Sequence, residues 1–291
     1  RAGLSDGGDP LAAFKVTLSR DQVADGRRVV HALEKLKLPD ESIMGQRELA
    51  CWHENKKTIT NSLKTLSSQI YSATTRILYE IIQNADDCSF ENDSCEANSQ
   101  RRPLRELYLE CSDDALVAYH NENGFQPKDL YAMCQVGESS KAAGSGKIGR
   151  KGIGFKSVFQ ICDRPVVLSP PFQFCFDTIK HSVFGYIVPS WVEKPHEHVP
   201  ARHHEHLERI FPGGSGTPSA TGTLLVCPMA ERVQGLDLMR DLSFDGLSLA
   251  FLKNLQKLSF VSSVSRGQGR QSESVPAASR ASSDQREVVY T

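Results

Sequence analysis

The segment at 80–87, Glu-Ile-Ile-Gln-Asn-Ala-Asp-Asp, places acidic and amide side chains near the C-terminal end of a long helical pattern. At about 100° per residue, Glu80, Asn84 and Asp87 fall within roughly 60° of one another on one helix face. Apolar residues occupy the opposite face, which would pack against a core. Carboxylate and carboxamide oxygens suit a hard cation such as Mg²⁺. A solvated helix face is the alternative interpretation of the same pattern.

A second segment that could do chemistry is glycine-rich and lies at 146–157. Gly149, Gly152 and Gly154 precede an apolar helical run, and Lys156 is one of four basic residues among them. A glycine turn that leads into a helix puts backbone N–H groups and the positive end of the helix dipole together, which suits phosphate. The segment is neither a Walker A loop nor a Rossmann fingerprint, because it lacks the first motif and no strand directly precedes it. A mobile surface loop is the alternative.

The composition sets limits on the class of protein. The chain has 291 residues, 39% of them hydrophobic, and a net charge of −1. This charge balance does not imply nucleic-acid binding. No apolar run approaches the ~20 residues that a membrane helix needs. No signal peptide is visible, and a chain that starts at Arg1 reads as a fragment or a processed form.

The eight cysteines are scattered, and none is spaced as C-x-x-C. Several lie inside apolar strand patterns, as Cys175 does between two phenylalanines. This distribution predicts buried free thiols in a reducing compartment, and therefore an intracellular protein, cytoplasmic or nuclear.

The pattern of elements predicts a two-layer α/β sandwich with helices on one face of a mixed sheet. An N-terminal helical extension covers 1–57, with a helix from Ser19 to Pro39 and a short helix near 48–54. A strong helical pattern runs from Thr58 to Ala85, with a kink near 72–75. Further helices are predicted at 127–135, from the glycine cluster to about 162, and at 247–255. Strands are predicted at 107–111, 115–120, 166–169, 172–177, 184–188, 223–228 and 258–261, and a disordered or truncated tail at 263–291.

The two chemical segments together resemble the GHKL ATPase superfamily, which includes gyrase, the large heat-shock chaperone and the histidine kinases. Its E-x-x-x-N-x-x-D box is matched by Glu80, Asn84 and Asp87, and a glycine box and a late Gly-Thr follow in order. The closer resemblance, over about 58–262, is to the sacsin and plant NO VEIN group. It is carried by the segments at 67–72, 80–87, 121–125, 136–141, 148–159 and 185–189.

The resemblance implies a fold and a role for each matching residue. The fold is a GHKL sandwich whose sheet is mixed and mostly antiparallel, and the cofactors are ATP and Mg²⁺. Glu80 would be the general base that activates water, and Asn84 would coordinate Mg²⁺. Asp87 would line the nucleotide pocket, and Thr223 would lie behind the adenine. The phosphates would be held by Gly149, Gly152, Ile153, Gly154 and Phe155, under a lid at 136–148 that contains Ser139, Ser140 and Lys141.

The adenine-reading box departs from the superfamily pattern D-x-G-x-G. The corresponding segment is His120-Asn121-Glu122-Asn123-Gly124, which has no aspartate. Asn121 is the preferred acceptor for the adenine amino group, with Glu122 next, because each offers a side-chain oxygen.

Five histidines crowd an insertion at 194–220. A solvated loop is the favoured interpretation and a metal site is the alternative, because the H-E-x-x-H spacing is absent.

The resemblance implies a domain that binds Mg·ATP and hydrolyses it slowly, so that lid closure drives a change in a chaperone-like or regulatory protein. The alternatives are a nucleotide-binding scaffold without turnover and a phosphotransferase of the histidine-kinase kind, although His31 lacks the acceptor signature. The partners implied are a protein client or further domains of a larger polypeptide, with dimerisation through regions outside this chain.

Overall fold

A mixed sheet forms the centre of the fold. The computed structural model describes residues 23–70, 77–90, 104–135, 154–212, 221–233, 252–263 and 286–290. In these ranges eight strands form one sheet in the order β5-β4-β3-β6-β2-β1-β7-β8. They are β1 (Glu106–Ser112), β2 (Ala115–His120), β3 (Val166–Ser169), β4 (Phe172–Phe176), β5 (Pro189–Trp191), β6 (Thr223–Pro228), β7 (Lys257–Ser263) and β8 (Arg286–Tyr290).

Neighbouring strands of this sheet are antiparallel except for β1 and β7, which run parallel. The β1–β2 hairpin turns at Asp113 and Asp114, between the strands predicted at 107–111 and 115–120. Ser112 Oγ stabilises this turn because it lies 2.6 Å from Asp114 Oδ1 and accepts a hydrogen bond from Ala115 N at 3.3 Å. The predicted mixed, mostly antiparallel sheet is confirmed.

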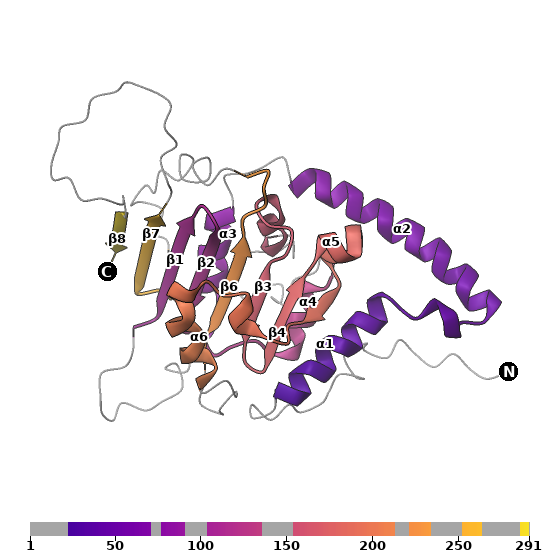
Figure 1. The fold of residues 1–291 in the computed structure, drawn as a ribbon, viewed down its shortest axis with the longest axis horizontal. Coiled ribbons are helices and arrows are strands. Elements are labelled where there is room, and N and C mark those ends of the chain that lie inside the picture. The colour runs from indigo at the N-terminus through magenta and orange to yellow at the C-terminus, as the bar shows by residue number, and fades with distance from the viewer. Residues whose placement is uncertain are drawn as a thin grey trace, which may run out of the picture.

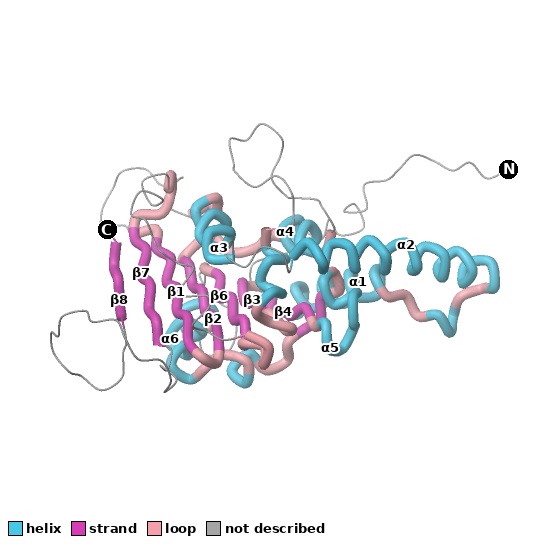
Figure 2. Tube along the Cα trace, turned by 90° about the horizontal axis from the view of Figure 1, so that it is seen from above, coloured by secondary structure: helices cyan, strands magenta, loops and turns pink. Residues whose placement is uncertain are grey.

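Helices cover one face of the sheet, as Figure 2 shows for α3 and α4. They are α1 (Val23–Lys37), α2 (Gln46–Ile70), α3 (Ile77–Asp86) and α4 (Pro127–Met133). The main core lies between these helices and the sheet, and both Leu33 of α1 and Leu63 of α2 are buried in it. The N-terminal helices are therefore part of this core, although most of α2 extends beyond the sheet (Figure 1).

The opposite face of the sheet is also covered, by the histidine-rich segment. Two short 3₁₀ turns at 195–197 and 201–203 lead into α6 (His204–Ile210), which lies across the sheet from α3 (Figure 2). Leu207 and Ile210 of α6 pack in a second apolar cluster with residues of β2, β3 and β6. His203 is buried, at 1% exposure. The prediction of a solvated loop is therefore wrong for 195–210, where apolar side chains fix the segment on the sheet.

Several predicted bounds differ from the structure. One continuous helix, α2, begins at Gln46 and replaces the predicted pair of helices near 48–54 and from Thr58. The kink at 72–75 lies outside the described residues. Residues 155–160 form a 3₁₀ helix instead of an α-helix, and 252–255 are not helical. The edge strand β8 lies within the predicted disordered tail.

The apolar run at 184–188, predicted as a strand, instead forms the last part of a 3₁₀ helix at 182–186 and the two residues after it. The preceding α5 (Thr178–His181) is capped by Asp177, which accepts a hydrogen bond from Lys180 N at 2.8 Å. Ser182 then adopts a left-handed φ of 52°. Gly185 comes so close to this turn that a Cβ on it would lie 2.6 Å from Thr178 Cα. Short apolar runs do not distinguish a strand from a buried turn by periodicity alone.

The cysteines in the described ranges are free thiols, and most are buried, as predicted. None of the helices in the described part of the chain combines the length and the apolar character needed to cross a membrane.

Candidate functional site

Helix α3 is oriented by its apolar face. Leu78, Ile82 and Ala85 are buried in the main core. The predicted site residues Glu80 and Asn84 lie on the other side and are half-buried. The helical spacing of the apolar residues therefore predicts correctly which face of α3 contacts the core.

The structure brings Glu80 next to the end of the glycine-rich segment. A Cβ on Gly154 would lie 3.2 Å from Glu80 Cδ and closer still to its Oε2. Gly154 is the N-cap of the 3₁₀ helix Phe155–Gln160, and Phe155 packs against Phe176, with 5.8 Å between the ring centroids. The absence of a side chain at Gly154 leaves the room that the Glu80 carboxylate occupies.

Other predicted phosphate-contacting residues fall outside the described ranges. These are Ser139, Ser140 and Lys141 of the lid at 136–148, and Gly149, Gly152 and Ile153 of the glycine turn.

The two neighbouring aspartates at the end of α3 have different environments. Asp87 is half-buried, and its backbone N–H donates to Gln83 O at 3.0 Å. Asp86 is buried, and its carboxylate accepts backbone hydrogen bonds from Lys253, Asn254 and Leu255 at 2.8–3.1 Å. Asp86 therefore fixes the loop that leads into β7, a role that the sequence analysis missed.

Asn121 uses both ends of its side chain to hold the start of β1. Its Oδ1 accepts from Glu106 N at 2.8 Å, and its Nδ2 donates to Leu104 O at 2.7 Å. A carboxamide with both ends on the backbone of its own sheet is a structural bridge.

Glu122, in contrast, is buried and contacts Thr223 across the sheet. Thr223 Oγ1 donates to Glu122 Oε1 at 2.6 Å, and the hydroxyls of Thr223 and Ser169 are 2.7 Å apart. Ser169 Oγ also accepts from Phe125 N at 2.9 Å. Gly124 lies in this loop at φ +85°, a conformation that favours glycine. The structure thus joins Glu122 and Thr223, which are 101 positions apart and were both predicted to lie beside the adenine.

Lys156 follows the glycine turn, but its side chain is 1% exposed and points into the core. Its Nζ donates to the carbonyl oxygens of Met133 and Tyr186 and lies 4.4 Å from the centroid of the Phe176 ring. Burial lowers the pKa of Lys156 to about 7. The sequence pattern groups this lysine with the phosphate-binding charges, whereas in the structure it joins the 3₁₀ helix at 155–160 to the end of α4 and to the 3₁₀ helix at 182–186.

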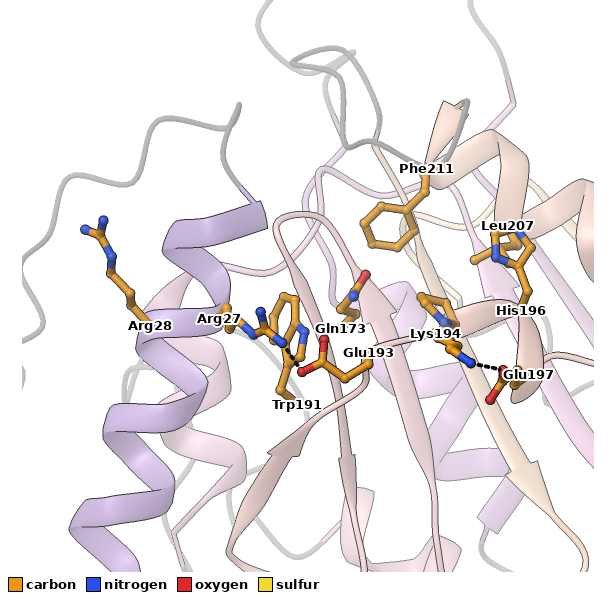
Figure 3. A pocket seen from close by; sticks show the side chains of 11 residues that line it. Arg27, Arg28, Gln173, Trp191, Glu193, Lys194, His196, Glu197, Leu207 and Phe211 are labelled. Carbon is orange, nitrogen blue, oxygen red and sulfur yellow. Dashed lines mark hydrogen bonds and ion pairs between the residues drawn. The ribbon is translucent and has the colours of Figure 1, made fainter.

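A hollow of about 810 Å³ lies elsewhere, between α1, the β4–β5 edge and α6 (Figure 3). Arg27 contacts Glu193 and lies 5.8 Å from the centre of the Trp191 ring, and Lys194 pairs with Glu197 at 2.7 Å. Among the described residues that line this hollow, none belongs to the predicted nucleotide site. Two of the cations that line the hollow, Arg27 and Lys194, are therefore already paired with carboxylates.

Comparison with known proteins identifies similar chains. A sequence model of the Sacsin domain family matches residues 56–212, more than half of the chain. Protein NO VEIN of Arabidopsis thaliana is 35% identical over 150 residues, which are 52% of this chain and 5% of that protein. Sacsin of Homo sapiens is 30% identical over 128 residues, which are 42% of this chain and 3% of that protein. The matched regions are therefore a small part of each of these curated relatives.

Proposed function

This chain belongs to the Sacsin domain family, and we propose that it is a GHKL-type domain that binds ATP with Mg²⁺ and hydrolyses it slowly. Nucleotide binding would then act as a signal to further domains or to a protein client. The proposal rests on the arrangement of the residues around α3.

The observation that carries the proposal is the contact between Glu80 and Gly154. A phosphate held by the backbone of the glycine turn would lie beside a carboxylate that can take a proton from water. The half-buried Asn84, one helical turn further along α3, would offer an oxygen ligand to Mg²⁺, which would supply charge stabilisation for phosphoryl transfer. Together these groups supply the general base and the metal ligand that phosphoryl transfer to water requires.

We assign the reading of adenine to Glu122 rather than to Asn121. Both polar ends of Asn121 are bound to backbone groups at 104 and 106, so that reading a base would require breaking one of these hydrogen bonds. A carboxylate has more than one acceptor position, so Glu122 can bind Thr223 and still accept from an amino group.

The test is calorimetric titration of the chain with ATP, with and without Mg²⁺, together with a turnover assay. We expect Mg²⁺-dependent binding, and turnover that falls about 100-fold or more in Glu80→Gln while binding is kept. Glu54→Gln, on an exposed part of α2, is the matched control and should behave as the native chain.

Three outcomes would change the proposal in different ways. If ATP does not bind in the presence of Mg²⁺, the proposed function is wrong. If ATP binds and Glu80→Gln hydrolyses it at the native rate, the general-base role is wrong. Binding without any turnover would favour the nucleotide-binding scaffold, which the absence of an aspartate from the adenine box also favours.

A further inference from the structure

Three side chains with metal-binding atoms meet where the end of α3 approaches the end of β2. Cys88 follows α3, His120 is the last residue of β2, and Glu122 lies two positions later. Their ligand atoms all lie within 4.8 Å of one another. In the described part of the chain, no other group of three His, Cys, Asp or Glu side chains meets this criterion.

The backbone holds these three residues in place. Asn123 N donates to Ser89 O at 2.9 Å and so joins the loop after Cys88 to the loop that contains Glu122. His120 is paired with Leu107 of β1 and with Thr223 of β6. Cys88 Sγ lies 3.0 Å from Asn84 O, one turn back along α3. The cluster is therefore built on a helix end and on the sheet, which positions ligands more firmly than free loops do.

His120 has a polar atom that the described part of the chain leaves without a partner. Its Nδ1 is buried and accepts or donates no hydrogen bond among the described residues. Glu122 Oε1 lies 3.9 Å from this nitrogen, beyond hydrogen-bond distance. An unsatisfied buried polar group is unfavourable, and a bound cation between the imidazole and the carboxylate would satisfy it.

We propose that Cys88, His120 and Glu122 form a binding site for a transition-metal dication, with Zn²⁺ as the best match. A thiolate, an imidazole and a carboxylate are ligands that Zn²⁺ accepts, with water completing a tetrahedral site. Mg²⁺ and Ca²⁺ prefer oxygen ligands alone, so this site is distinct from the Mg²⁺ position assigned to Asn84. Binding converts the Cys88 thiol to a thiolate and releases its proton to solvent.

The site would fasten the end of α3 to the sheet. Glu122 also has a role in the proposed function, and the roughly four acceptor sites on its two oxygens are enough for Thr223, a metal and the amino group of adenine. The metal proposal does not depend on nucleotide, and its test therefore uses Cys88 and His120 and is carried out without ATP.

The test is titration of the metal-free full chain with Co²⁺, followed by displacement of the Co²⁺ with Zn²⁺. Ligation of Co²⁺ by a thiolate produces a sulfur-to-cobalt charge-transfer band. We expect one ion per chain to produce this band, Cys88→Ser to abolish it, and Cys51→Ser, at an exposed cysteine, to keep it. His120→Gln should weaken Zn²⁺ binding by at least the ~10–100-fold that is typical when a supporting residue is lost.

The band, rather than bound metal alone, is the deciding signal because the histidine-rich segment could also bind Co²⁺, without sulfur. Circular dichroism of each variant checks that it is folded. If Cys88→Ser does not fold, His120→Gln and Zn²⁺ competition decide the question. The proposal is overturned if the native chain gives no thiolate band, if the band persists in folded Cys88→Ser, or if folded His120→Gln binds Zn²⁺ with native affinity.

Discussion

The buried carboxylate of Asp86 accepts a hydrogen bond of 2.8 Å from the backbone nitrogen of Asn254, 168 positions further along the chain. The backbone carbonyl of Asp86 also accepts from Asn254 Nδ2 at 2.6 Å. These bonds link the end of α3, which carries Glu80 and Asn84, to the loop that precedes β7. The helix with the proposed chemistry is thereby fixed to the parallel part of the sheet.

We predict that Asp86→Ala lowers the free energy of unfolding by about 3 kcal/mol, because it leaves several buried backbone N–H groups without an acceptor. Urea unfolding followed by circular dichroism measures this change. Asp87→Ala is the adjacent control, and it should change stability much less while weakening nucleotide binding. Equal losses of stability in the two variants would show that Asp86 is not the anchor.

The difference between these two aspartates could have been found in the sequence. On a helical projection, Asp86 falls within roughly 40° of Ile82, on the buried face of the helix. A carboxylate on an apolar face needs hydrogen-bond donors, but periodicity cannot say which ones. They come from residues 253–255, and the contact depends on the tertiary fold.

Other parts of the fold also divide into features that the sequence pattern predicts and features that depend on tertiary contacts. The hairpin at 106–120 was predictable because two apolar, strand-like runs flank an Asp-Asp turn. The packing of α6 on the second sheet face was not, because Leu207 and Ile210 are sparse apolar residues within a polar, histidine-rich segment. In the candidate site, the helix spacing predicted the face that carries Glu80, whereas the use of Asn121 as a backbone bridge depends on where β1 begins.

We predict that Gly154→Ala reduces ATP turnover about 10-fold or more and changes the free energy of unfolding by less than about 1 kcal/mol. The added methyl group would meet Glu80 Oε2, the end of a flexible side chain, so the carboxylate can move away at little expense to the fold. Turnover and urea unfolding measure the two effects.

Gly45→Ala is the control for this substitution, because a Cβ there would have only an ordinary contact, 3.6 Å from Glu48. In a Glu80→Gln background, Gly154→Ala should cause little further loss of turnover, since both changes act through the same carboxylate. A large additional loss would contradict the direct contact.

We predict that Glu122→Gln lowers ATP affinity about 10-fold and reduces the preference for ATP over GTP, because a carboxylate accepts the adenine amino group more strongly than a carboxamide does. Calorimetry with both nucleotides measures the ratio of affinities. Asn121→Ala is the comparison variant, and it should lower stability but leave that ratio unchanged. If instead Asn121→Ala changes the ratio and Glu122→Gln does not, the original preference for Asn121 as the adenine-reading residue is correct.

Buried Lys156 predicts a pH dependence of stability. Burial lowers its pKa to about 7 in the folded chain, whereas an unfolded lysine titrates near pH 10.4. Between these values the unfolded chain binds more protons, so this residue makes the folded state more stable as the pH rises from about 7 to about 10, by up to about 1.4 kcal/mol per pH unit. Its contribution is least favourable below pH 7.

Urea unfolding at a series of pH values measures this slope, and Lys156→Met isolates the contribution of the lysine. Met retains a long apolar side chain near the Phe176 ring, and the difference between the native chain and the variant removes the contributions of cysteines and tyrosines that titrate in the same range. The difference in unfolding free energy should favour the native chain increasingly as the pH rises from 7 to 10. A difference independent of pH would mean that the carbonyl oxygens of Met133 and Tyr186 keep Lys156 charged throughout.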